Sequence, residues 1–153
     1  MSARKPLQPD ALPDHLARWL EAVSRRLHSE LGTGVRDEFP ELRGSHRRIL
    51  QMIPGEGIRV TDLAAMAKMT KQALGEVADS LEGSGFVRSQ RDDADRRVRR
   101  LFRTDLGDKA ADATQRAIAS IEAQWRQEIG PGPYDAMKQA LRKLGQDSLK
   151  PEG

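Results

Sequence analysis

Apolar side chains recur at three- and four-residue steps along the first part of the chain, which is the spacing of one helix face. The pattern predicts a long amphipathic helix that Asp14 caps and that Gly32 and Gly34 end. Its apolar positions are Leu16, Trp19, Leu20, Val23, Leu27 and Leu31.

A longer apolar series predicts a second extended helix in the last third of the chain. Thr104 can cap it, and one face stays apolar for about seven turns. Its positions are Leu106, Ala110, Ala113, Ala117, Ile121 and Trp125. The PGP at residues 131–133 breaks this helix, and Pro133 can begin a last one. That last helix has an apolar face at Tyr134, Met137, Leu141 and Leu144.

Shorter elements fill the middle of the chain. A helix over about residues 45–53 stops at the PGEG that follows, and residues 58–60 are too few for more than a minimal strand. Thr61 can cap a short helix that runs to Ala67, and Thr70 can cap another. The buried stripe of the second short helix is expected at Leu74, Val77, Ala78 and Leu81. Two short helices joined by a tight turn form a helix-turn-helix pattern.

A β-hairpin is expected after these helices. FVRSQ and VRRLFRT contain β-branched and aromatic residues, and the charged segment RDDADRR separates them. The fold class is therefore mainly α, with the order helix, helix, helix-turn-helix, hairpin, long helix, helix. The terminal helices have long apolar stripes that the small central module cannot cover, which points to a partner chain.

Composition narrows the classes of protein. A chain of 153 residues fits one domain, and the absence of cysteine excludes disulfides and thiolate zinc sites. The sequence contains no apolar run long enough for a membrane span and no signal-peptide core, so we expect a cytoplasmic protein.

Positive charge gathers at the hairpin. Residues 88–103 contain seven arginines and three aspartates, a balance of +4 that exceeds the +3 of the whole chain. A hairpin tip is expected to be exposed, where an ion pair contributes at most about 1 kcal/mol. The cluster therefore indicates binding to an external polyanion.

The second helix of a helix-turn-helix fits the major groove of DNA and points its first residues at base edges. Thr70 and the free amides at its start suit a phosphate, Lys71 suits guanine or a phosphate, and Gln72 can pair with adenine. The exposed face continues over Gly75, Glu76 and Asp79.

The hairpin can act as a wing beside that helix. Arg96 and Arg97 at its tip suit the minor groove, whose negative potential attracts arginine. Arg88, Arg91 and Arg99 are expected to add affinity, in part through phosphates.

Residues 70–107, TKQALGEVADSLEGSGFVRSQRDDADRRVRRLFRTDLG, resemble the recognition helix and wing of the MarR family of bacterial regulators. The best matches are TKQ, LEGSGFV, and the DRR that precedes Thr104 and Gly107. The resemblance implies that Arg97 enters the minor groove with Asp95 as its orienting partner. Arginine at positions 100 and 103 departs from the aliphatic residues usual in that strand, which leaves the strand register open.

The resemblance also implies a domain organisation and a function. Residues 1–13 are expected to form a flexible arm, 14–44 and 105–149 the dimerisation helices, and 45–104 a winged helix-turn-helix with its wing at 86–104. A homodimer would bind a pseudo-palindromic operator on double-stranded DNA as a repressor at the nucleoid. A small phenolic or lipophilic ligand would release it.

A ligand pocket and an enzyme are harder to argue from these residues. Trp19, His46, Met52, Met66 and Trp125 are pocket candidates, with core or dimer packing as the alternative role. The three histidines are too scattered for catalysis, and arginines flank the carboxylates of DDAD, so we expect no enzyme, cofactor or metal. The rival functions are an architectural DNA-binding protein and a helical module that binds an acidic protein.

Overall fold

The computed structural model describes residues 14–146 and 148. The predicted arm at 1–13 lies outside the described residues, as do most positions after 146. The elements are α1 (Leu16–Arg36), α2 (Gly44–Met52), β1 (Ile58–Arg59), α3 (Val60–Ala67), α4 (Lys71–Gly83), β2 (Val87–Arg91), β3 (Arg99–Arg103), α5 (Asp105–Ile129) and α6 (Pro131–Gly145). This order confirms the predicted mainly α class.

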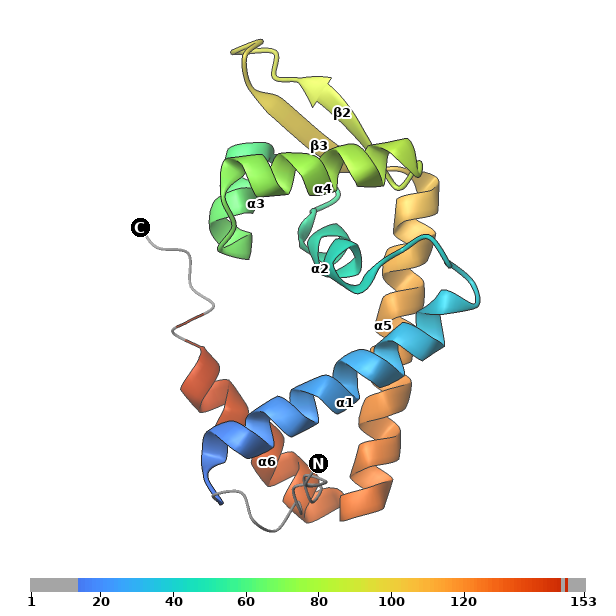
Figure 1. The fold of residues 1–153 in the computed structure, drawn as a ribbon, viewed down its shortest axis with the longest axis vertical. Coiled ribbons are helices and arrows are strands. Elements are labelled where there is room, and N and C mark those ends of the chain that lie inside the picture. The colour runs from blue at the N-terminus through green and yellow to red at the C-terminus, as the bar shows by residue number, and fades with distance from the viewer. Residues whose placement is uncertain (1–13, 147, 149–153) are drawn as a thin grey trace, which may run out of the picture.

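The long helix α5 connects two parts of the molecule (Figure 1). The first turns of α5 contact α2 and β3, and α4 and α3 extend away from them, while α1 crosses the middle of α5 and α6 folds back from its far end. None of the described helices is long and apolar enough to span a lipid bilayer.

The buried core lies beneath α4, between the short helices and the sheet. Leu50 of α2, Leu63 of α3, Leu74 of α4 and Leu101 of β3 are all fully buried in it. The stripe predicted for α4 is confirmed, because Leu74, Ala78 and Leu81 are buried and Val77 is half-buried. Burial of one face leaves the opposite face of α4 open.

The three strands form one antiparallel sheet in the order β1-β3-β2. Ser89 of β2 pairs with Leu101 of β3, and Arg88 pairs with Phe102. Leu101 is the inward residue of β3, so Arg100 and Phe102 on either side of it face the other way. Arg103 shares the face of Leu101 but pairs with Asp108 at 2.7 Å, so neither Arg100 nor Arg103 disturbs the register that the sequence left open.

The first helix differs from its prediction at both ends. It continues through Gly32 and Gly34 to Arg36, so neither glycine ends the helix. This part of α1 packs on α5, where a Cβ at Gly34 would make ordinary van der Waals contact with that of Ala117, at 3.4 Å. The N-cap is His15, whose Nδ1 accepts from the amide of Arg18 at 3.2 Å. The predicted cap Asp14 instead accepts from the Trp19 indole at 2.5 Å.

Two of the three predicted threonine caps are confirmed. Thr70 accepts from the amide of Ala73 at 3.1 Å, and Thr104 accepts from that of Gly107, also at 3.1 Å. No other residue fits at position 107, since a Cβ there would lie 2.0 Å from the Phe86 carbonyl oxygen. Thr61 is not a cap, because α3 begins earlier, at Val60.

Candidate nucleic-acid interface

The start of α4 presents free polar groups on an open face. Thr70 uses its hydroxyl to cap the helix, while Lys71 and Gln72 are exposed and have no hydrogen bond or ion pair to another described residue. A Cβ built on Gly75 would meet nothing within 4 Å. This face is free to contact an external surface.

The wing projects beyond α4 (Figure 1). Arg97 stands at its tip with 96% of its side chain exposed. Asp95 Oδ1 accepts from the Arg97 amide at 3.0 Å and lies 4.0 Å from its Nε, which agrees with the orienting role predicted for Asp95. Arg96 beside it is exposed and has no bonded partner in the described part of the chain.

A cavity of about 330 Å³ separates α4 from the wing. Val60, Thr61 and Val98 contribute to its walls. Five predicted DNA-binding residues from different elements line it together: Lys71, Gly75, Arg91, Arg97 and Arg99. The hairpin and the helix therefore share one concave, cationic surface.

A network of polar bonds fixes the wing against α4. Arg99 donates to Asp79 at 2.7 Å and to Glu82 at 2.8 Å. Glu82 also accepts from the amide and the hydroxyl of Ser89, each at 2.7 Å. The bond from the Ser89 hydroxyl is the largest cause that lowers the pKa of Glu82. Because two carboxylates already hold its guanidinium, Arg99 sets the distance between helix and wing.

A buried carboxylate holds the base of the tip. The side chain of Asp92 is only 8% exposed, and it lies 3.3 Å from Arg59 and 3.5 Å from Arg100. Asp92 also accepts from the amide of Ala94, and this bond is the largest cause that lowers the pKa of Asp92. The expectation of a fully exposed tip is wrong for this residue, because β1 brings Arg59 against it from a distant part of the chain.

The remaining wing arginines differ in their freedom. The Arg88 guanidinium lies over the Phe102 ring, 4.5 Å from its centroid, and donates to Gln90 at 3.4 Å. Arg91 is exposed and makes no bond to another described side chain. Arg91, Arg96 and Arg97 are therefore the wing cations most available to an external anion.

The predicted ligand-pocket residues lie on four different elements. The Trp19 indole donates to Asp14, whereas the Trp125 indole donates to Glu30 at 2.9 Å. Met52 packs against the core, and Met66 is exposed on α3. His46 is half-buried on α2, where burial is the largest cause that lowers its pKa. Their common role in a pocket remains a prediction.

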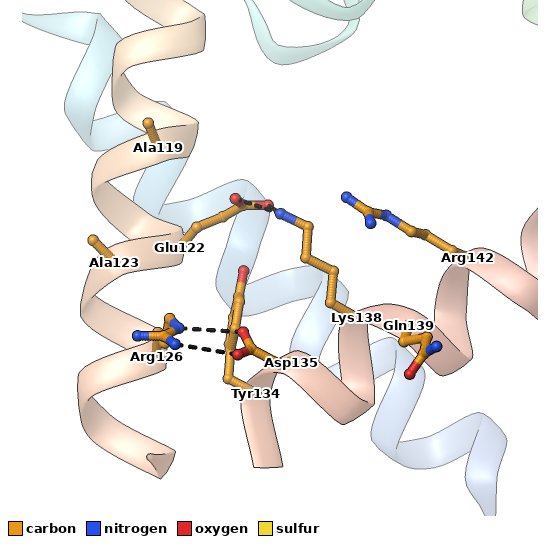
Figure 2. A pocket seen from close by; sticks show the side chains of 9 residues that line it. All are labelled: Ala119, Glu122, Ala123, Arg126, Tyr134, Asp135, Lys138, Gln139 and Arg142. Atoms are coloured by element: carbon orange, nitrogen blue, oxygen red, sulfur yellow. Dashed lines mark hydrogen bonds and ion pairs between the residues drawn. The ribbon is translucent and has the colours of Figure 1, made fainter. Parts of the chain in front are cut away.

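A further cavity, of about 490 Å³, lies between α5 and α6 (Figure 2). Four of its charged side chains pair across the two helices: Lys138 bonds Glu122 at 2.7 Å, and Arg126 bonds Asp135 at 3.1 Å. The charges cancel within each pair, and the pairs hold α6 against α5. Arg142, which also lines the cavity, adds one positive charge.

Residues 49–98 match the MarR family in a comparison with protein families. The segment runs from α2 to the wing tip and contains the start of α4 and Arg97. Transcriptional regulator HosA of Escherichia coli is 26% identical over 121 residues, which cover 78% of this chain and 90% of HosA.

Solved structures show the same fold. The crystal structure of MarR has a TM-score of 0.75 at 20% identity and covers 88% of this chain and 97% of its own. CouR from Rhodococcus jostii RHA1, bound to p-coumaroyl-CoA, has a TM-score of 0.66 at 17% identity. That match covers 86% of this chain and 91% of CouR.

Proposed function

Because this chain is a MarR family transcriptional regulator, we propose that it binds a pseudo-palindromic operator as a homodimer and represses transcription. The observation that supports this proposal best is the shared concave surface between α4 and the wing. Lys71 and Arg91 on this surface have no bonded side-chain partner among the described residues, and Asp79 and Glu82 beside it are bonded to Arg99.

The start of α4 enters the major groove in this proposal. Lys71 and Gln72 are free to donate to base edges, and the open Gly75 lets the helix approach the duplex without a side chain in the way. The unbonded amides of the first turn of α4 suit a backbone phosphate beside Thr70.

The wing enters the adjacent minor groove. Arg97 inserts between the two strands, held by Asp95, while Arg91 and Arg96 meet phosphates. Arg88 and Arg99 act mainly through position, since Phe102 orients the former and the carboxylates on α4 hold the latter.

Dimerisation explains most of the large apolar side chains that the described part of the chain leaves exposed. Apart from Met66 and Leu106, they lie in the first half of α1, at the end of α5 and on α6, and a second copy would cover them. These residues are Leu16, Trp19, Leu20, Val23, Ile129, Leu141 and Leu144, all more than 40% exposed. Helices 14–44 and 105–149 would thus form the dimerisation region, with 45–104 as the DNA-binding module.

Release by a small ligand completes the proposal. CouR was solved with p-coumaroyl-CoA, an aromatic thioester, so a protein of this fold accommodates such a molecule. Trp19, Met52 and Trp125 would supply aromatic and polarisable surface for a small aromatic or lipophilic ligand, and His46 and Met66 are proposed for the same role.

The salt dependence of duplex binding tests this function. If each protomer neutralises about four phosphates, log affinity should fall against log salt concentration with a slope of about −7. A fluorescence titration of labelled operator between low and physiological salt measures it.

The same titration with random duplex separates the rival functions. A specific regulator should favour its operator by ~10³ or more. Equal affinity for both duplexes would indicate an architectural protein, and no salt-sensitive binding at all would indicate a protein-interaction module.

A further inference from the structure

A cavity of about 300 Å³ lies where the end of α1, the α1–α2 connection and the start of α2 meet. Among the described residues that line it, three are arginines and none is acidic. The arginines are Arg36, Arg43 and Arg47, and the other lining residues are Gly32, Pro40, Leu42 and Gly44.

Arg47 is the unusual member of this group. Only 6% of the residue is exposed, yet its guanidinium has no hydrogen bond or ion pair to any described residue. Burial lowers the pKa of Arg47, and no acidic group opposes that effect. Since arginine remains protonated in proteins, Arg47 is a largely enclosed cation with no counter-charge among the described residues.

The guanidinium groups of Arg47 and Arg36 each lie next to a glycine that lines the cavity. A Cβ on Gly44 would lie 3.7 Å from Arg47 Nη2, and a Cβ on Gly32 would lie 3.8 Å from Arg36 Nη2. No buried side-chain nitrogen or oxygen of the described residues lacks a hydrogen-bond partner. The unbonded nitrogens of Arg47, which lines this cavity, are therefore not fully enclosed and stay accessible to a ligand.

Neighbouring acids do not neutralise the cluster. Glu38 forms its ion pair with Arg116 of α5 at 3.6 Å, and Asp37 and Glu41 are exposed outside the cavity. The contrast is the cavity between α5 and α6 in Figure 2, where Arg126 and Lys138 each bond a carboxylate. Positive charge at the α1–α2 junction is left for an external anion.

We propose that this cavity binds a small multivalent oxyanion of the phosphate or pyrophosphate class. Arg36 of α1 and Arg47 of α2 donate to its oxygens, and Arg43 adds positive charge at the N-cap of α2. The first amides of α2, at Gly44, are further donors at a helix start. None of the cavity residues belongs to the DNA-binding surface, so the proposal stands independently of operator binding.

Titration of the full chain with sodium pyrophosphate, without DNA, tests the proposal. Calorimetry at constant ionic strength, set with sodium chloride, should detect saturable binding that Arg47→Met and Arg36→Gln each weaken by about tenfold or more. Arg48→Met is the matched control, because Arg48 lies on the same helix but donates to the Ala67 carbonyl oxygen at 3.3 Å.

Several results would overturn the proposal. Wild-type protein that responds to pyrophosphate no more than to chloride would do so, as would binding that survives both Arg47→Met and Arg36→Gln. Variants that lose duplex affinity and keep pyrophosphate affinity would instead assign these arginines to the DNA backbone. Arg36 is exposed, so Arg36→Gln gives the answer even if Arg47→Met folds poorly.

Discussion

Replacing Arg97 with alanine is expected to weaken operator binding about 100-fold. Each wing would lose a charge-assisted contact that contributes about 1.5 kcal/mol, and a dimer loses two of them. The effect should exceed that of Arg96→Ala, because Asp95 orients only the Arg97 side of the tip. A fluorescence titration of labelled operator at one fixed salt concentration measures the change.

Stability should not change in the Arg97 variant. The Arg97 side chain is 96% exposed, and its ion pair with Asp95 spans 4.0 Å. The melting temperature is therefore expected to match that of the wild type. Arg116→Ala is the matched control, since it removes the same charge from the middle of α5, away from the wing. Unchanged operator affinity in Arg97→Ala, or an equal loss in Arg116→Ala, would contradict the wing assignment.

The double substitution Leu16→Glu and Leu20→Glu is expected to produce a monomer. Leu16 is 67% and Leu20 47% exposed, on one face of α1, so the single chain tolerates carboxylates there while an apolar interface does not. Because both half-sites must bind together, operator affinity should fall by ~10³ or more. Sedimentation gives the mass, and the operator titration gives the affinity.

A charge-matched control separates the interface from electrostatics. Arg25→Glu also changes the charge by two negative units, on an α1 side chain that is 74% exposed and pairs only weakly with Glu21. It should remain dimeric and lose far less affinity. A double variant that stays dimeric would show that this face of α1 lies outside the interface.

Periodicity predicted those elements whose signals are local. Thr70 and Thr104 begin helices because a threonine hydroxyl satisfies a free amide within its own first turn. The stripe of α4 follows from the helical repeat alone, and its opposite face is the candidate DNA surface. The position of the site could therefore be predicted without the structure.

Long-range packing explains the features that the sequence did not predict. Gly34 stays inside α1, where the helix packs against Ala117 of α5, far along the chain. Asp92 is buried because Arg59 and Arg100 converge on it from two strands. Arginine is usually a surface residue, but the junction of α1 with α2 encloses most of Arg47. No local pattern contains these neighbours.

The arginines of the wing differ in their contacts, which the sequence did not predict. The sequence predicts that the strand arginines Arg88 and Arg99 add affinity, but the structure pairs Arg99 with two carboxylates and stacks Arg88 on Phe102. Arg91, Arg96 and Arg97 keep their charge available. Position and affinity thus come from different residues of one charged segment.

Selection of bound duplexes from a random pool tests the central claim most directly, namely that two copies of α4 and the wing bind one duplex. The enriched sequences are expected to form a pseudo-palindrome whose half-sites lie about one helical turn apart. Enrichment of a single asymmetric site, or of no sequence at all, would contradict the account.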